Sequence, residues 1–116
     1  MKKLTLHTTS EDELDYRIYL LADAETMAYN AAWSADGTGR ILITQTQARK
    51  WHRGLSQTGM FYAYVLADGQ PVGEVNIHKN GKIGIIIEVK HRGKGYAKQA
   101  LKLLCDKAFD KFNYDA

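Results

Sequence analysis

The sequence has little of what would mark a membrane-bound or secreted protein. It contains one cysteine, Cys105, so an internal disulfide cannot form, and a reducing, cytoplasmic setting is the default expectation. No apolar run approaches the roughly 18 residues that a membrane-spanning helix needs. The basic residues near the N-terminus are not followed by the long apolar stretch of a signal peptide. We therefore expect a cytoplasmic protein that is not embedded in a membrane.

The sequence also lacks internal repeats, low-complexity segments and a linker rich in proline, glycine or serine. Its 116 residues are enough for one hydrophobic core and too few for two. Apolar residues make up 45% of the chain and charged residues 25%, which is typical of a globular protein. We predict a single domain over residues 1–116.

The net charge of +3 is a mild excess. It is the only feature that suggests a nucleic-acid partner, and we expect none, because the chain has no basic helix with base-reaching polar residues and no stacking platform. Lysine and arginine are concentrated in the last third of the chain. Most of these side chains are expected simply to face solvent. The alternative is that some of them meet a phosphate-bearing ligand, namely Lys90, Arg92, Lys94 and Lys98.

The spacing of apolar residues predicts the order strand, two helices, three strands, helix, which is an α/β (α+β) arrangement on a mixed sheet. Two capping boxes, Ser10 with Glu13 and Thr44 with Gln47, predict the starts of the first two helices. The first helix should break near Asp23, and the second should end before Gly59. The strands are expected at 4–8, 60–67, about 72–77 and 83–89, with hairpin turns at Asp68-Gly69 and Asn80-Gly81, and the last helix at 96–112.

The last strand and the last helix carry the clearest patterns. Residues 83–89 are almost continuously apolar, as expected of a strand buried on both faces. The helix that follows is amphipathic. Its core-facing residues are predicted to be Ala97, Ala100, Leu101, Leu104, Cys105, Ala108 and Phe112.

Between that strand and that helix lies a short glycine-rich turn, Arg92-Gly93-Lys94-Gly95. The first backbone N–H groups of a helix have no partner within the helix, and the helix dipole places partial positive charge there. Glycine lets the backbone approach a ligand without a Cβ in the way. A pyrophosphate or several phosphates are the expected ligand. A glycine-rich turn that binds nothing is the alternative.

Two common phosphate-binding patterns do not fit this turn. The Walker pattern is absent, and the dinucleotide fingerprint fails because Lys98 stands where its third glycine should be. The pattern that fits is Arg-x-x-Gly-x-Ala, from Arg92 to Ala97. It resembles the Gln/Arg-x-x-Gly-x-Gly/Ala signature of the GNAT N-acetyltransferase superfamily, and the order of elements is similar to that family over essentially the whole chain.

The resemblance implies a site for acetyl-CoA. Backbone groups from Ile87 to Val89, Glu88 included, would pair with the pantetheine arm, and a nearby N–H would stabilise a developing oxyanion. The N–H groups of the turn would hold the pyrophosphate, with Lys98 adding charge. No metal is implied. The residues concerned in the turn are Arg92, Gly93, Lys94, Gly95, Tyr96 and Ala97.

The implied reaction is direct attack by an amine, which must lose a proton to a carboxylate or to a relayed water. Glu74 and Glu88 are the acids available on the central strands, and Glu74 is preferred because the acceptor would approach across them. Either carboxylate could instead simply face solvent. Cys105 is expected in the core and is a poor nucleophile, and His78 and His91 are expected at the surface.

The acceptor would be an amine of a small molecule or a peptide, bound by the N-terminal half of the chain. The stretch that contains Tyr29, Asn30 and Trp33 resembles one found after the first helix in some GNAT proteins. Trp51 and Tyr62 could also line such a pocket, although aromatic residues at helical spacing more often belong to a core. The competing hypothesis is a CoA-binding or protein-interaction module of GNAT-like fold that does not catalyse transfer.

The sequence departs from the family where a fifth strand, a further helix and a closing hairpin usually follow. The chain reaches Asn113-Tyr114-Asp115-Ala116 where the fifth strand should begin. The strand at 83–89 would then be an open edge, which favours pairing with another chain. Either the sequence is truncated, or a homodimer covers or completes the sheet edge.

Overall fold

The computed structural model describes residues 2–34 and 36–112, with side chains up to Lys107 in the last helix. The described chain forms two compact units. One contains the residues up to Thr8 and those from Leu55 onward, and the other runs from Thr9 to Gly54. None of the described helices is long and apolar enough to cross a membrane.

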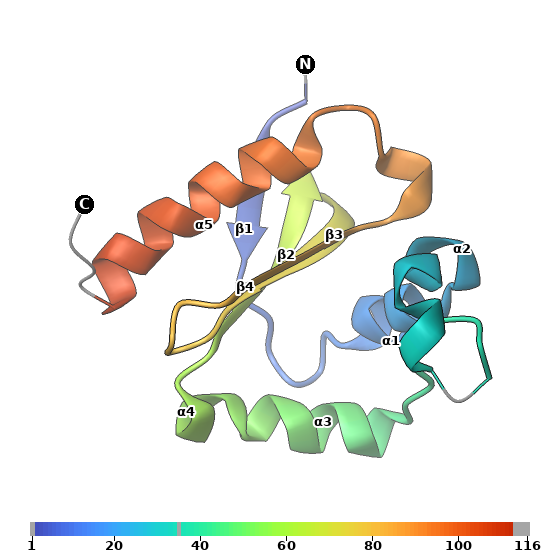
Figure 1. Ribbon diagram of the computed structural model, residues 1–116. Coiled ribbons are helices and arrows are strands. Elements are labelled where there is room, and N and C mark those ends of the chain that lie inside the picture. Colours follow the sequence, from blue (N-terminus) through green and yellow to red (C-terminus); the bar gives the residue numbers. More distant parts are fainter. Residues whose placement is uncertain (1, 35, 113–116) are drawn as a thin grey trace. The chain divides into compact units, whose positions relative to one another are not determined.

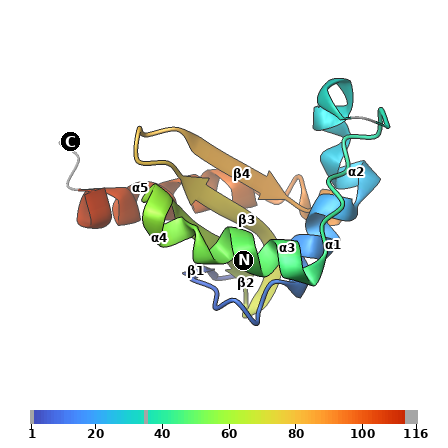
Figure 2. The ribbon, with the colours of Figure 1, turned by 90° about the horizontal axis from the view of Figure 1, so that it is seen from below.

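The first unit is built on a four-stranded sheet with the order β1-β2-β3-β4 (Figures 1 and 2). The predicted α/β (α+β) class is confirmed. The sheet was predicted to be mixed, whereas every strand pairing among the described residues is antiparallel. Both predicted hairpin turns are present, and Asp68 and Gly69 have the positive φ angles that a two-residue hairpin loop requires. The strands are β1 (Leu4–His7), β2 (Phe61–Ala67), β3 (Gln70–Ile77) and β4 (Ile83–Ile87).

A β-bulge determines which side chains share a face of the sheet. Leu66 is opposite Pro71, but Val65 is opposite Gly73, so Val72 is the extra residue on β3. As a result, Ala63 and Val75 point to the same face. That face carries the hydrophobic core. The opposite face carries Tyr62, Tyr64, Glu74 and Asn76.

Helix α5 (Tyr96–Phe112) packs on the core face and contacts β1, β3 and β4 (Figure 1). Its buried side is turned relative to our prediction. Ala100 and Leu104 are buried as expected, but Ala97 and Leu101 are exposed, and Tyr96 and Leu103 take their place in the core. Ala108 and Phe112 lie outside the described side chains. The sequence pattern was ambiguous because apolar residues occupy neighbouring positions at 100–101 and 103–105.

Strand β4 is not buried on both faces, so that prediction is wrong. Among the described residues it pairs only with β3, so it is an edge strand, as we expected from the point that the sequence reaches in the family's order of elements. Ile83 is exposed and Ile85 and Ile86 are half-buried, whereas Ile87 is buried. The strand ends at Ile87 rather than Val89, because Val89–His91 form a short 3₁₀ turn, η2.

The second unit consists of α1 (Asp15–Ala22), α2 (Ala24–Met27), the 3₁₀ helix η1 (Ala28–Trp33) and α3 (Gln45–Arg53). The break near Asp23 is confirmed. Segment 9–12 is tied to α3 by His52 Nε2 and the carbonyl of Thr9 at 2.9 Å, and by Arg53, which donates to both carboxylate oxygens of Glu11. Helix α3 ends at Arg53, and a separate turn, α4 (Leu55–Thr58), follows Gly54, so the continuous helix predicted up to Gly59 is divided.

The two predicted capping boxes differ. The Thr44 box is complete, since Thr44 Oγ1 accepts from the N–H of Gln47 and the Gln47 side chain accepts from the N–H of Thr44. At Ser10 the Glu13 side chain accepts from the Ser10 N–H, and the N–H of Glu13 donates to the backbone carbonyl of Ser10. That segment is a turn, and α1 begins at Asp15 without a side-chain cap, so the predicted helix start at Ser10 is wrong.

Candidate functional site: a glycine turn at the start of helix α5

The turn predicted to bind phosphate connects β4 to α5. The first backbone bond of the helix joins the N–H of Gln99 to the carbonyl of Gly95 at 3.2 Å. The N–H groups of Tyr96, Ala97 and Lys98 precede that bond, so they have no partner within the helix. Gly95 has no side chain that could cap them. The start of α5 therefore presents hydrogen-bond donors and partial positive charge to an anion.

The two glycines of the turn give a ligand access to this backbone. Gly93 and Gly95 have φ angles of +81° and +78°, which residues other than glycine rarely adopt. A Cβ placed at Gly93 would meet no atom within 4 Å, and one at Gly95 would meet only the Gln99 amide nitrogen at 4.0 Å. The backbone is thus open on the side where an anion would bind, and the turn fits a pyrophosphate.

The cations of the turn have different roles. The side chains of Lys94 and Lys98 are exposed. Arg92 donates from Nε to the carbonyl of Ile87 at 3.0 Å, and so connects the turn to the end of β4. Lys90 Nζ lies 3.3 Å from Oε2 of Glu88, so its charge is shared with a carboxylate.

The pKa of the His91 imidazole is affected by burial and by these neighbouring charges. Partial burial lowers its pKa below the usual 6.5. The charge of Glu88 raises this pKa, while the ammonium groups of Lys94, Lys90 and Lys2 lower it further. His91 is half-buried rather than at the surface as predicted.

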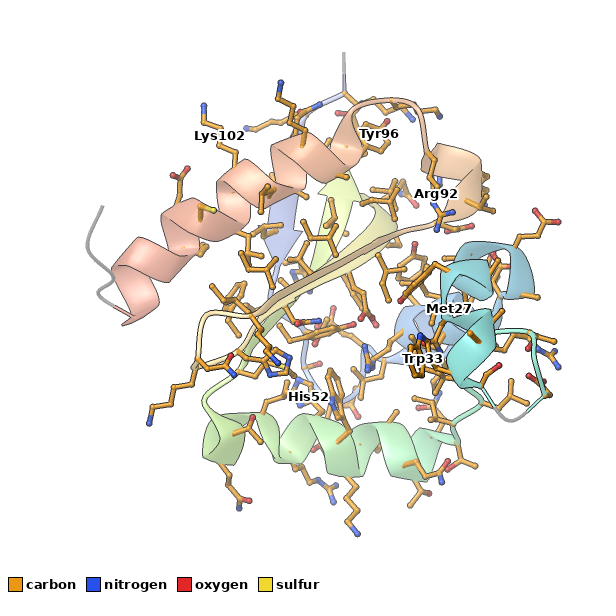
Figure 3. All side chains as sticks on the ribbon, viewed as in Figure 1. Met27, Trp33, His52, Arg92, Tyr96 and Lys102 are labelled. Atoms are coloured by element: carbon orange, nitrogen blue, oxygen red, sulfur yellow. The ribbon has the colours of Figure 1, made fainter. Side chains whose placement is uncertain are left out.

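Tyr96 contributes differently from its neighbours in the motif. Its side chain is buried in the core cluster with Ala100 and Leu104. Only its backbone can therefore face a ligand. Figure 3 shows Arg92 on the turn that precedes α5 and Tyr96 in the first turn of the helix. Ile87, the last residue of β4, is buried, and Val89, the first residue of η2, is half-buried.

Glu74, the preferred acid, lies on β3 on the sheet face opposite the core. Its exposed fraction is only 2%, so the prediction that it could simply face solvent is wrong. Tyr62 donates a hydrogen bond from its hydroxyl to Glu74 Oε1 at 2.7 Å. Glu74 is paired with Ile86 of β4 on one side and with Tyr64 of β2 on the other. The carboxylate is therefore one strand away from β4.

Glu88 is also buried, with an exposed fraction of 3%. It follows β4 directly, and its backbone N–H donates to the carbonyl of Val72 at 2.8 Å, while its carbonyl accepts from His91. With its carboxylate held by Lys90, Glu88 fastens the turn to the sheet. Cys105, which we expected in the core and not as a nucleophile, is half-buried on α5.

The residues predicted to bind the acceptor lie in η1 of the second unit. The side chains of Tyr29 and Trp33 are 66% and 85% exposed, so neither belongs to a core. The Asn30 amide donates to the carbonyl of Gly39 at 3.2 Å, which holds the loop at 34–40. Two other aromatic residues were predicted as possible pocket residues. The guanidinium carbon of Arg17 lies over the Trp51 ring, 3.8 Å from the ring centroid, and Tyr62 donates a hydrogen bond to Glu74.

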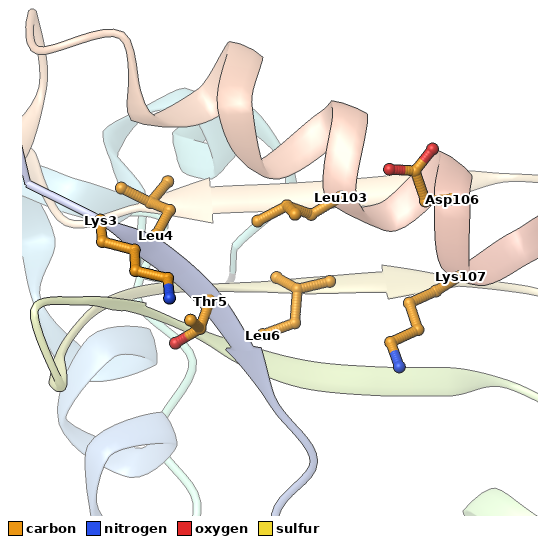
Figure 4. A pocket seen from close by; sticks show the side chains of 7 residues that line it. All are labelled: Lys3, Leu4, Thr5, Leu6, Leu103, Asp106 and Lys107. Carbon is orange, nitrogen blue, oxygen red and sulfur yellow. The ribbon is translucent and has the colours of Figure 1, made fainter.

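A cavity of about 350 Å³ lies between β1 and α5 (Figure 4). Leucine side chains form most of its wall, with polar residues at the rim. It is at the β1 edge of the sheet, and the glycine turn follows β4 at the other edge. The cavity is thus separate from the glycine turn. Its lining residues are Lys3, Leu4, Thr5, Leu6, Leu103, Asp106 and Lys107.

Sequence reasoning missed three contacts of this region: those of Tyr62 with Glu74, Arg92 with Ile87, and Lys90 with Glu88. The last of these has a signal in the sequence, since the two charges are only two residues apart. The first has an indirect signal. Val72 is out of phase with Val75 and Ile77 in a period-2 strand, which indicates a bulge.

Comparison with known proteins agrees with the geometry. The sequence model of the family described as "Acetyltransferase (GNAT) domain" matches residues 3–116. A search of curated proteins found no match. An acetyltransferase structure from Thermus thermophilus is similar, with a TM-score of 0.68 and 17% identity, over 91% of this chain and 71% of that one.

Two further structures bear on ligands. One is an aminoglycoside acetyltransferase in complex with coenzyme A, with a TM-score of 0.72, 15% identity and coverage of 93% of this chain and 68% of that one. The other, from Salmonella typhimurium, modifies the N-terminal serine of a 50S ribosomal subunit protein; its TM-score is 0.66, at 19% identity, over 93% of this chain and 64% of that one. The chain spans about two thirds of the length of these structures. At such identities the likeness establishes the fold.

Proposed function

The chain belongs to the GNAT acetyltransferase family, and we propose that it is an acetyl-CoA-dependent N-acetyltransferase that acts on an amine of a small molecule or peptide. The observation that carries this proposal is the turn from β4 into α5, with two positive-φ glycines, open space around them and helix N–H groups that have no partner within the helix. The family match runs through both compact units, which supports one GNAT-like domain over residues 1–116.

In this proposal the pyrophosphate of CoA is held by the N–H groups from Gly93 to Lys98, with charge from Arg92 and Lys94. Backbone groups from Ile87 to Val89 are the proposed contacts of the pantetheine arm. The Glu88 N–H already donates to the carbonyl of Val72, so Glu88 would offer its carbonyl, which can accept a second hydrogen bond. Acetyl-CoA supplies the acetyl group as a thioester: a C–N bond replaces the C–S bond, and the acceptor ammonium loses two protons, one to the thiol and one to solvent. A base on the protein is needed to take from the ammonium the proton that is then passed to solvent.

Glu74 is the base that we propose. It lies on the strand next to β4, on the face away from the core. Glu88, the second candidate, is held by the Lys90 ammonium, and its backbone fastens the turn to β3, which suits a structural role. Glu74→Gln should therefore lower kcat by about 100-fold or more, while Glu88→Gln should act mainly on stability and CoA affinity. A lower kcat for Glu88→Gln alone would reverse the assignment.

For the acceptor we propose contact with Tyr29 and Trp33, because large aromatic side chains so exposed are commonly used in binding. Asn30 would act by holding the neighbouring loop. The two neighbours that modify an aminoglycoside and a protein N-terminus support the small-molecule and peptide classes without choosing between them.

The cofactor site is tested by calorimetric titration of the chain with CoA and with acetyl-CoA. Wild type should bind both, and Gly95→Glu should lose binding because a carboxylate would occupy the place of the pyrophosphate. Gly37→Glu is the matched control. Gly37 has a similar φ of +74° and open space around it, but it lies in the loop at 34–40. Equal affinities for all three chains would rule out the turn as the CoA site.

A second candidate function is a CoA-binding or interaction module that does not catalyse transfer. The burial of both Glu74 and Glu88 favours it, since a base has to reach its substrate. Binding of acetyl-CoA without acetylated product would select this function.

We further propose that the open edge of β4 pairs with a second copy of the chain, and that the protein is cytoplasmic. The sheet order of the described residues supports the first point, and the single half-buried cysteine supports the second. Sedimentation over a range of concentrations tests the homodimer, and a monomer at every concentration would contradict it.

A further inference from the structure

The contact between Tyr62 and Glu74 is a polar interaction between two nearly inaccessible side chains. Tyr62 is 4% exposed and Glu74 is 2% exposed. A carboxylate removed from water is costly unless hydrogen-bond donors satisfy it. The phenol hydroxyl is one such donor, and its 2.7 Å bond to Oε1 has the ordinary length of an O–H···O hydrogen bond.

The geometry of the sheet makes this contact specific. Tyr64, not Tyr62, stands opposite Glu74, and Tyr62 stands opposite Asn76. Tyr62 on β2 therefore reaches diagonally to the carboxylate on the neighbouring strand β3. The rings of Tyr62 and Tyr64 lie edge to face, with centroids 6.0 Å apart and planes at 75°. This packing holds the Tyr62 ring in the orientation that the hydrogen bond needs.

The bulge at Val72 creates this arrangement. With an unbroken two-residue hairpin register, Glu74 would stand opposite Ala63 and share the core face with it. The extra residue instead puts Glu74 opposite Tyr64, on the face away from α5. The same bulge offers the carbonyl of Val72 to the N–H of Glu88 at 2.8 Å. One irregularity thus orients Glu74 and anchors the turn that leads to the glycines.

We infer that Tyr62 is a positioning residue for acetyl transfer: its hydroxyl holds the Glu74 carboxylate in the orientation in which it takes a proton from the acceptor ammonium. This inference rests on the proposed function, in which Glu74 is the base. In this role Tyr62 acts through the Glu74 carboxylate and makes no contact of its own with the acceptor or acetyl-CoA.

A double-mutant cycle tests this role. The acceptors are the aminoglycoside ribostamycin and a short peptide with an N-terminal serine. Acetyl-CoA is the donor, and the release of CoA is followed. Tyr62→Phe should lower kcat roughly tenfold, because a misoriented base costs one to two orders of magnitude. The KM for acetyl-CoA should not change. In a chain that already carries Glu74→Gln, Tyr62→Phe should cause no further loss.

Ile77→Val is the control for a general loss of stability. Ile77 is buried on the same strand as Glu74 but on the core face, so its variant should keep the wild-type kcat. Three results would each overturn the positioning role alone. The first is that the kcat losses of Tyr62→Phe and Glu74→Gln multiply in the double variant, and the second is that kcat is unchanged in Tyr62→Phe. The third is that Ile77→Val loses as much kcat as Tyr62→Phe. A wild-type chain that turns over neither acceptor would contradict the proposed function and this inference together.

Discussion

Arg92 is the residue that joins the two parts of the proposed cofactor site. Its Nε donates to the carbonyl of Ile87, so one side chain links the end of β4 to the turn that begins α5. In the GNAT signature an arginine or glutamine occupies this position. Both side chains can donate to a carbonyl, which fits the contact seen here.

Replacing Arg92 by alanine should weaken CoA binding without abolishing it. The variant loses one hydrogen bond made by a charged group and one charge near the phosphates, about 1.5 kcal/mol, or a roughly tenfold rise in Kd. Calorimetric titration measures this change. Lys102→Ala is the control, because Lys102 is an exposed cation on α5 beyond its first turn (Figure 3). A similar loss of CoA affinity in both variants would mean that the affinity depends only on net charge and not on the position of Arg92.

The bulge explains why the Tyr62–Glu74 contact did not follow from the sequence. A residue-by-residue count back from the Asp68-Gly69 hairpin places Glu74 opposite Ala63, which is on the wrong face. The motif from Arg92 to Ala97, in contrast, is contiguous, so its position in the fold could be predicted from local sequence. Contacts across strands depend on register, and a single extra residue shifts every later pair.

Among the elements, α5 carries the turn, and the packing of its buried side fixes how the first turn of the helix faces a ligand. Leu104 is fully buried, whereas Leu101 is 41% exposed. The amphipathic pattern alone assigned both to the core, since helical spacing tolerates either. The orientation was decided by Tyr96 and Leu103, which reach the sheet.

This orientation can be measured from stability. Leu104→Ala should lower the free energy of unfolding by about 2–5 kcal/mol, because it leaves a cavity in the core. Leu101→Ala should cost less than about 1 kcal/mol, as an exposed substitution does. Urea denaturation of both variants gives the comparison. Equal losses would return Leu101 to the core and contradict the packing described.

The two capping boxes offer a second test at the level of elements. Thr44→Ala should cost about 1 kcal/mol, because the N–H of Gln47 loses its side-chain acceptor. Ser10→Ala should change the free energy of unfolding by no more than about 0.5 kcal/mol, since the Glu13 side chain bonds to the backbone N–H of Ser10, which alanine keeps. Thermal unfolding of both variants separates them. A larger loss at Ser10 would support the helix start that the sequence pattern predicted.

At the scale of the whole molecule, the family and the order of elements could be predicted from the sequence because each depends on local periodicity and on one contiguous motif. The division into two compact units could not, because no linker separates them in the sequence. Nor could the burial of the two acids, because a period-2 pattern shows which residues share a face of the sheet and not how much of each is exposed. The proposed CoA turn belongs to one unit and the proposed acceptor residues to the other.

The central claim is that the chain transfers an acetyl group and does not merely bind its donor. The most direct measurement is mass spectrometry of ribostamycin and of a peptide with an N-terminal serine after incubation with isotope-labelled acetyl-CoA. The account predicts labelled acetyl on an amine of at least one acceptor, with one CoA released per product, and loss of both in Gly95→Glu. Binding of acetyl-CoA with no labelled product would contradict the claim and identify a module that binds CoA without catalysis.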